Sequence, residues 1–523
     1  MASALASCGI FFALYFAPAA NAQAPVSGRP VFNILDYGAH KDGSAPSTEA
    51  FRKAIEAAKM AGGGTIYAPA GRYVSGPIEL YSNMTLDVGA GARIVFPVAP
   101  LPFVKGRYLG VDALVPMPLI GGHDVTNVTV TGRGILQTGD FQAWADAYGP
   151  PVRNQSGNAN GPAWEHLLKA LNANQPVTQA EYLAAAKELR PDVLCFMNAK
   201  NILIQNIRII GGPAFVVHLL YSQNATVNNV IEQSYPGAHA NGIVVDSSRF
   251  VRISNDYIDT GDDGIVIKSG KGADGLRVNR PSEDVAITNC TVHHAHGAVV
   301  IGSETAGGIR NVVASNITAV GTERGIRVKS RRGRGGVIED LRFDNWTMEH
   351  VGTGIVVTCY YIMGGEAPTK EEPVSIRTPV FRNIAISNVT ISHATRAVVN
   401  IEGLPEMPIT GLHLMDILGS GKRGLIAAHT NAMELRHLQI NPETGPAFAI
   451  ATASNLLLDG ISSRDPAAGS PVLRLTASPG AILEDSHAFP GTDVFLSTTP
   501  NEKRTLQLSG DILKNAKVPM QSN

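Results

Sequence analysis

Short stretches of alternating aliphatic residues, most of them opening with a polar residue, recur through most of the chain. Such alternation is typical of β-strands that bury one face. The stretches at 201 and 224, at 224 and 250, and at 284 and 311 start 23, 26 and 27 residues apart, a spacing typical of solenoid repeats. The set comprises NVTV at 127, NILI at 201, NATV at 224, FVRI at 250, DVAI at 284, NVVA at 311, NIAI at 383 and NLLL at 455.

This repeat predicts an all-β fold, a single-stranded right-handed parallel β-helix. One coil cannot bury its inward aliphatic residues alone, so stacked coils must supply a continuous core. Asparagine at the strand starts suits the bends between strands, because it tolerates left-handed backbone and its side chain can bond nearby backbone. This structural role explains the sequons at strand starts better than glycosylation does; these sequons lie at Asn83, Asn127, Asn224, Asn316, Asn345 and Asn388.

Two segments depart from the β pattern and predict helices. The segment 46–63 has helical apolar spacing, with Thr48 as its cap and Gly62 as its stop, and would cover the open end of the solenoid core. Residues 160–189 are rich in helix formers. We expect a helical insertion over 141–189. It would close one end of the cleft in which the polar stretches described below meet.

The start of the chain resembles an export signal. An apolar run at 10–20 is followed by ANA at 20–22, which predicts cleavage after Ala22, although no Lys or Arg precedes Arg29. We therefore expect a secreted or periplasmic protein. The expected organisation is a signal peptide at 1–22, an N-terminal cap and first coils at 30–140, the helical insertion at 141–189, catalytic coils at 190–465, and C-terminal coils with a cap at 466–523.

Composition narrows the classes of partner. The chain has 43 Lys and Arg against 44 Asp and Glu, so nothing indicates binding to nucleic acid or to an anionic membrane. After the leader no apolar run is long enough to cross a bilayer. Beyond Cys8 only three cysteines remain, without metal-like spacing, which predicts buried free thiols rather than a zinc site or a disulfide framework. We expect a monomer.

Four polar stretches stand about one coil apart and predict a shared site. They are HANGIVVDSS at 239–248, TGDDGIVIKSG at 260–270, HGAVVIGSE at 296–304 and RGIRVKS at 324–330. Stacked on consecutive coils, they would bring six side chains into one cleft. These are Asn241, Asp262, Asp263, His296, Arg327 and Lys329.

Asp262 and Asp263 are adjacent, so two outward carboxylates require a bend near Gly261, which that glycine and Gly264 would permit. Two carboxylates forced close together cannot both ionise freely, and they can divide into acid and base. Taken alone, GDDG is more often a solvated turn; the conjunction with the neighbouring stretches favours a site.

With these stretches the sequence resembles glycoside hydrolase family 28, the polygalacturonases and their relatives. The resemblance covers roughly residues 30–465 and includes FNILDYGAHKDG at 32–43 and GGGTIYAPAGRYVSGPIEL at 62–80. It implies a pectin-lyase-like solenoid and an enzyme that cleaves α-1,4-galacturonosidic bonds of pectin with inversion and without a cofactor or metal.

The resemblance also implies roles for single residues. Asp262 would be the general acid, Asp263 the base that activates water, and His296 a partner that shares a proton with the acid. Arg327 and Lys329 would bind a galacturonate carboxylate. A substrate-contacting tyrosine falls on Tyr360 or Tyr361, and Tyr361 is preferred.

One position departs from the family pattern. Asn241 stands where the family has an aspartate that assists the base, and His239 stands where the family has asparagine. Asparagine can orient a water but cannot take its proton, so Asp263 would act as base alone. Asp246 lies five residues on and would point away from Asn241 in a straight strand.

Two other functions remain open at this point. A β-helix pectic lyase would use calcium and an arginine base, whereas the paired aspartates and the histidine suit hydrolysis better. A noncatalytic pectin-binding protein would retain the scaffold without the chemistry. Among hydrolases, Arg327 and Lys329 favour a galacturonate beside the scissile bond, and the insertion weakly favours exo cleavage over endo cleavage.

Overall fold

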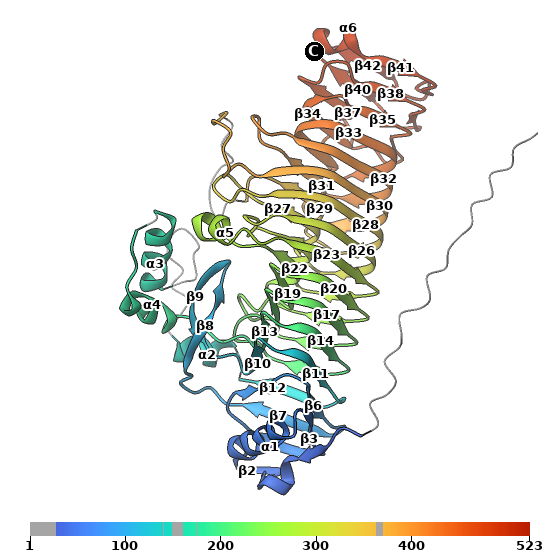
Figure 1. Cartoon of the computed structure of the whole chain (residues 1–523). Coiled ribbons are helices and arrows are strands. Elements are labelled where there is room, and N and C mark those ends of the chain that lie inside the picture. The colour runs from blue at the N-terminus through green and yellow to red at the C-terminus, as the bar shows by residue number, and fades with distance from the viewer. Residues whose placement is uncertain (1–27, 140, 149–160, 174, 362–369, 523) are drawn as a thin grey trace, which may run out of the picture.

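The coils stack into one elongated right-handed parallel β-helix, which the computed structural model describes for residues 28–139, 141–148, 161–173, 175–361 and 370–522 (Figure 1). The first coils and the last coils lie at opposite ends of the stack. The expected signal peptide at 1–22 lies outside the described residues. Among the described helices, none is long and apolar enough to cross a membrane.

Each coil contributes strands to three parallel ladders, which we call sheets 1, 2 and 3. Sheet 1 comprises β5 (Ile78–Glu79), β10 (Ile120–His123), β13 (Leu194–Met197), β16 (Val217–Leu220), β19 (Ile243–Asp246), β22 (Asp263–Lys268), β25 (Gly297–Ile301), β27 (Arg324–Lys329), β29 (Thr353–Thr358), β31 (Ala397–Glu402), the start of β33 (Leu425–Pro442), β34 (Phe448–Ser454), β37 (Pro471–Thr476), β40 (Val494–Thr498) and β42 (Val518–Ser522).

Sheet 2 comprises β1 (Val31–Asn33), β3 (Gly64–Ala68), β6 (Met84–Val88), β11 (Thr126–Thr131), β14 (Lys200–Gln205), β17 (Gln223–Asn228), β20 (Arg249–Ser254), β23 (Ser282–Thr288), β35 (Leu457–Asp459), β38 (Ile482–Glu484) and β41 (Gln507–Ser509). Sheet 3 comprises β2 (Asp42–Pro46), β4 (Gly71–Val74), β7 (Ala92–Phe96), β12 (Ile135–Thr138), β15 (Arg208–Ile210), β18 (Ile231–Gln233), β21 (Tyr257–Asp259), β24 (Thr291–His293), β36 (Ser462–Ser463) and β39 (His487–Ala488). The long strands that run through sheets 2 and 3 are β26 (Ile309–Val320), β28 (Val337–Glu349), β30 (Val380–Ala394), β32 (Ile409–Gly421) and the later part of β33.

The core is a column of inward aliphatic side chains, each stacked on its register partner in the next coil. In sheet 1, Ile243 pairs with Ile265 and Ile265 with Val299, and all three are fully buried. Alternation along each strand therefore turns the intervening residues to the outer face of the sheet.

The asparagines at strand starts form ladders along the outside. Asn83, Asn127, Asn201 and Asn224 all have left-handed backbone, as expected of residues at these bends. Their side chains bond one another, because Asn127 donates to Asn83 at 2.9 Å and Asn201 donates to Asn127 at 2.8 Å. The asparagine side chains therefore bond asparagines of a neighbouring coil, whereas the sequence had predicted hydrogen bonds to nearby backbone.

The N-terminal helix α1 (Thr48–Met60) packs its apolar face on the first coils, and η1 (Ile34–Tyr37) adjoins it. Gly62 follows with left-handed backbone, as expected of a stop. The expected cap was wrong by one residue, because Ser47 precedes the helix and the Thr48 hydroxyl instead accepts a hydrogen bond from Gly76 N at 2.8 Å.

Helices α2 (Phe141–Ala147), α3 (Pro162–Asn172) and α4 (Gln179–Ala186) form the helical insertion beside the stack, where α5 (Gly272–Val278) also lies (Figure 1). An antiparallel hairpin of β8 (Phe103–Tyr108) and β9 (Val111–Pro116), which the strand pattern had not predicted, stands between the insertion and the solenoid. At the other end, α6 (Pro500–Thr505) lies among the last coils.

Candidate active site

The predicted site residues gather on consecutive strands of sheet 1. Asn241 precedes β19, Asp262 and Asp263 stand at the start of β22, and His296 precedes β25. These strands pair in parallel in that order, and β27 follows with Arg327 and Lys329. Because adjacent strands lie about 4.8 Å apart, residues one coil apart become side-chain neighbours.

Asp262 is surrounded by imidazoles. His296 Nδ1 lies 3.1 Å from its Oδ1, and His239 Nδ1 lies 3.5 Å from its Oδ2. Burial alone would raise the pKa of Asp262, but hydrogen bonds and charge from the two histidines outweigh it and lower that pKa well below its ordinary value. The hydrogen bond to Asp262 in turn raises the pKa of His296. The cluster can hold a proton on an imidazole next to a carboxylate.

Asp263 is held by cations instead. Its side chain is buried, with Lys329 Nζ 2.8 Å from Oδ2 and Arg327 Nη1 3.3 Å from Oδ1. Each carboxylate oxygen has two lone-pair directions, so both oxygens can still accept a hydrogen bond from a water. Two adjacent aspartates thus sit in different electrostatic surroundings.

Tyr361 completes the cationic side of the site. Its ring centroid lies 4.8 Å from Lys329 Nζ and 5.4 Å from the Arg327 guanidinium carbon. Burial and the charge of Arg327 lower the pKa of Lys329 to about 8, although Asp263 opposes them. Tyr360 instead adjoins Arg332 and Glu406, so the structure brings Tyr361 to the other site residues.

The chain bends at Gly261 and Asp262 before entering β22, where the sequence had predicted a bend. Neither Gly261 nor Gly264 has left-handed backbone. A Cβ on Gly261 would lie 2.5 Å from Gly237 O, and one on Gly264 would lie 2.8 Å from Ala298 O. The glycines therefore permit close approach of neighbouring coils.

Asn241 is buried near the acid, with Nδ2 3.5 Å from Asp262 Oδ2. Its Oδ1 is buried and has no hydrogen-bond partner among the described residues. Asp246 does not replace a carboxylate there, because it pairs with Arg107 at 2.8 Å. The expectation that Asp246 points elsewhere agrees with this contact.

Two residues near the acid were not among the predicted site residues. His239 contacts Asp262 directly, and Glu323 Oε1 lies 3.8 Å from His296 Nε2. His239 was visible as a departure at the first motif. Glu323 gave no signal, because it comes just before β27 and only the coil register brings it to His296.

The hairpin β8–β9 lies across the outer face of sheet 1. Leu109 at its tip packs against a buried apolar cluster of Phe215, Val244, Val266 and Val300. Arg107 reaches Asp246, and Gly110 O accepts a hydrogen bond from Lys271 N at 2.9 Å. The insertion braces the hairpin, since Trp164 makes an edge contact with Tyr108 at 5.2 Å between ring centroids.

A cavity of about 370 Å³ lies between the hairpin and sheet 1. Arg107, Tyr108, Arg190, Asp192 and Cys195 are among its lining residues. Burial raises the pKa of Tyr108, and the charges of Asp192 and Asp262 contribute to the same shift. The cavity thus lies on coils that precede those of Asp262 and Asp263, and neither aspartate is among its lining residues.

The three described cysteines are free, as expected. Cys290 and Cys359 are buried, whereas Cys195 is partly exposed at the cavity wall. Burial and the charge of Asp192 raise the pKa of Cys195 well above its ordinary value.

Comparison with known proteins gives the same family as the motifs. The model described as "Glycosyl hydrolases family 28" matches residues 178–433, and "Rhamnogalacturonase A/epimerase, pectate lyase-like" matches residues 31–99. A probable polygalacturonase of Vitis vinifera is 28% identical over 399 residues, covering 74% of this chain and 73% of the relative.

Two further similarities span most of the chain. An exo-poly-alpha-D-galacturonosidase of Dickeya chrysanthemi is 28% identical over 402 residues, covering 74% of this chain and 65% of the relative. The crystal structure of a hyperthermoactive exopolygalacturonase from Thermotoga maritima superimposes with a TM-score of 0.65 at 29% identity, covering 77% of this chain and 87% of that one. With the motif residues assembled on one face of the solenoid, these matches lead to one conclusion: the chain belongs to glycosyl hydrolase family 28 and is a glycoside hydrolase.

Proposed function

We propose that this protein is a polygalacturonase that hydrolyses α-1,4-galacturonosidic bonds of pectin. The observation that carries the proposal is the Asp262–Asp263 pair, with one carboxylate among imidazoles and the other among cations. Relatives named as polygalacturonases support the choice of substrate.

In the proposed reaction, Asp262 protonates the glycosidic oxygen and Asp263 takes a proton from the attacking water. The water oxygen bonds to the anomeric carbon as the bond to the leaving oxygen breaks, which inverts the configuration. Because the pKa of Asp262 is lowered and that of His296 is raised, the proton rests on His296 and passes through Asp262 as the glycosidic oxygen takes it up, while His239 contacts the other Asp262 oxygen. Asp263 then gives its proton to water, and His296 takes one up from water for the next turnover. Asn241, which cannot serve as a base, orients the water or the acid.

Arg327, Lys329 and Tyr361 are proposed to bind the substrate. Both cations already contact Asp263, so a galacturonate carboxylate would share them. Arg327 offers a planar fork for a carboxylate, and Lys329 offers a point charge. A neutral sugar at that position would leave both cations without a second anionic partner.

We propose exo cleavage. The hairpin and the helical insertion cover the outer face of sheet 1 beside the carboxylates, which would stop a polymer from passing through. The cavity between the hairpin and sheet 1, on the coils that precede the carboxylates, would have room for a chain end. Two of the compared proteins are named as exo-acting enzymes.

Export, domain bounds and assembly belong to the same proposal. Residues 1–22 would be removed as a signal peptide, leaving a secreted or periplasmic monomer. The mature chain would comprise the cap and first coils at 30–140, the insertion at 141–189, the catalytic coils at 190–465 and the terminal coils at 466–523. N-terminal sequencing of exported protein tests the cleavage after Ala22.

The activity is tested on polygalacturonic acid with the purified mature protein, following reducing ends, ultraviolet absorbance and product size together. We expect reducing ends without absorbance, and galacturonate monomer as the first product. The Asp263→Asn variant should lose at least about 10²-fold in rate, with unchanged circular dichroism. Ultraviolet-absorbing products would indicate elimination and contradict hydrolysis, and oligomers as first products would contradict the exo mode alone.

A further inference from the structure

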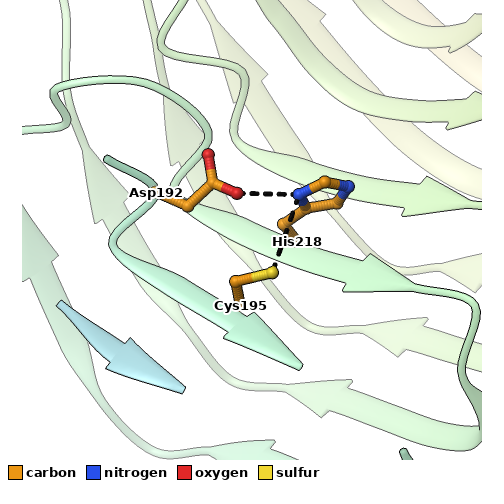
Figure 2. Close-up of side chains that lie close together, drawn as sticks. All are labelled: Asp192, Cys195 and His218. Carbon is orange, nitrogen blue, oxygen red and sulfur yellow. Dashed lines mark hydrogen bonds and ion pairs between the residues drawn. The ribbon is translucent and has the colours of Figure 1, made fainter. Parts of the chain in front are cut away.

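Three side chains outside the carboxylate site lie close together (Figure 2). Asp192 and Cys195 line the cavity, and the buried His218 lies next to them. His218 Nδ1 lies 2.7 Å from Asp192 Oδ2 and 3.8 Å from Cys195 Sγ. One ligand atom of each residue lies within 4.8 Å of the other two. Imidazole, thiol and carboxylate are all metal-ligating groups.

The coil register brings these groups together. Asp192 comes just before β13 and Cys195 lies within it, while His218 lies in β16 of the next coil. Cys195 and His218 are direct register partners, 23 residues apart in sequence. Both side chains therefore project from the same face of sheet 1 about 4.8 Å apart along the stack. The position is fixed by the solenoid rather than by a flexible loop.

The arrangement does not suit nucleophilic catalysis by Cys195. A thiol–imidazole–carboxylate relay uses both ring nitrogens, one for the nucleophile and one for the carboxylate. Here Asp192 and Cys195 both approach Nδ1 (Figure 2). Nε2 has no hydrogen-bond partner among the described residues. Nothing therefore transmits a proton from the thiol to the carboxylate through the ring.

The separation of the sulfur and nitrogen donors is close to that of a tetrahedral zinc site. Metal–ligand bonds of about 2.3 Å to sulfur and about 2.1 Å to nitrogen or oxygen imply donor separations of about 3.6 Å for S–N and about 3.4 Å for N–O. The Cys195–His218 separation of 3.8 Å already matches. The Asp192–His218 separation of 2.7 Å must widen, which a carboxylate at a cavity wall can do by rotation.

We propose that Asp192, Cys195 and His218 bind one divalent cation of borderline softness, with zinc preferred. The thiolate and imidazole favour such a cation over calcium or magnesium, which require oxygen ligands. Asp192 and Cys195 line the cavity, so the fourth coordination position faces it. A thiolate and a carboxylate together balance the two positive charges of the cation, so the occupied site is neutral overall.

This site is separate from the proposed hydrolytic machinery. In sheet 1, β13 pairs with β16, β16 with β19 and β19 with β22, which places Cys195 three strands from the strand of Asp263. The hydrolytic roles of Asp262 and Asp263 require no metal. The proposal therefore does not depend on the sugar substrate, and metal binding is tested without an activity assay.

Cobalt(II) is the probe, because its thiolate complexes absorb in the near ultraviolet and its tetrahedral complexes absorb strongly in the visible. Tag-free full-length mature protein is stripped with a chelator, titrated with Co²⁺ and then with Zn²⁺. We expect one Co²⁺ per chain, with a thiolate charge-transfer band that one equivalent of Zn²⁺ removes.

Cys195→Ser should abolish the charge-transfer band and weaken cobalt binding at least about 100-fold. Loss of a residue that only hydrogen-bonds to a metal ligand typically weakens binding by about 10- to 100-fold, so a larger loss indicates a direct ligand. Asp192→Asn, a nearly isosteric change at the cavity wall, should weaken binding in the same direction and guards against misfolding of the cysteine variant. Cys290→Ser is the matched control, because that thiol is buried and donates to Thr288 O. It should leave the band unchanged.

Two results would overturn the proposal. One is the absence of a charge-transfer band in folded wild-type protein at millimolar Co²⁺. The other is a band that persists in Cys195→Ser or disappears in Cys290→Ser. Either result would leave the three residues as a hydrogen-bonded cluster, and neither would bear on pectin hydrolysis.

Discussion

Asp262 and Asp263 are neighbours in sequence, yet their side chains meet different partners. The bend before β22 turns Asp262 toward His239 and His296, while Asp263 turns toward Arg327 and Lys329. The pKa of an acid responds to such partners more than to its position in a motif. We assign the proton-donating role to Asp262 because His296, whose pKa is raised, adjoins it.

The alkaline limit of activity should depend on His296. Its raised pKa keeps the proton bound to higher pH than a free imidazole would, and activity is lost as pH rises through that pKa. In His296→Gln the proton reservoir is removed. We expect the alkaline limb of kcat/KM to move to lower pH, with a loss of about 10²- to 10⁴-fold at pH 7. A pH–rate profile measures both.

Asn241→Asp provides the opposing control. A new carboxylate near Asp262 disfavours its ionised form and raises the pKa of both Asp262 and His296. The alkaline limb should therefore move to higher pH. If both variants shifted the limb in the same direction, His296 would not be the proton reservoir.

At the scale of elements, the site depends on strand starts and on one hairpin. Asn241, the two aspartates and His296 stand where strands of sheet 1 begin, and Arg327 and Lys329 lie further along β27, so the coil repeat assembles them. The hairpin β8–β9 instead reaches the site from far away in sequence, since Arg107 and Asp246 are 139 residues apart. We attribute substrate access to this hairpin.

Displacing the hairpin tip from sheet 1 should reduce the share of exo cleavage. Leu109→Asp places a charge against the apolar cluster of Val244, Val266 and Val300, which disfavours the closed position. We expect a larger share of oligomers among the first products of polygalacturonic acid, measured by chromatography. Leu508→Asp, at a partly exposed strand far along the chain, is the control and should not change the products. An unchanged monomer product from Leu109→Asp would contradict the assignment.

At the scale of the molecule, stability comes from stacking each coil on its neighbours. Adjacent residues of one long strand show this, because Ile417 is fully buried and Leu418 is 52% exposed. Ile417 pairs in register with Val389 and Leu438, which are also buried. A side chain removed from this column would leave a cavity between its two register partners.

Truncating each of these two residues should show how much the burial of a side chain, rather than its size, contributes to the free energy of unfolding. Ile417→Ala is expected to lower the free energy of unfolding by about 2–5 kcal/mol, since it leaves a cavity in the stacked column. Leu418→Ala removes the same number of carbons from the surface and should change it by less than about 0.5 kcal/mol. Urea denaturation measures both. Equal effects would mean that the two side chains are not differently buried in solution.

The sequence alone determined the class of fold, and it predicted which of the proposed site residues share one face of the solenoid. Aliphatic residues alternate in strands such as 201–205, and this pattern recurs about once per coil. Both features can be read from the sequence without knowledge of tertiary contacts. The same repeat aligned Asp262, His296 and Arg327, because residues one coil apart must become neighbours in a solenoid. The helical insertion was visible through its loss of β alternation.

Only the tertiary structure decided which groups surround each carboxylate and what covers them. Glu323 reaches His296, and the Leu109 tip reaches Val266, through contacts that no local periodicity encodes. Cys195 and His218 gave no metal-like spacing, because the ligands are separated by one coil rather than by a short loop. The repeat predicts which residues share a face, but the exact partners depend on bends, on register and on the packing of the inserted hairpin and helices.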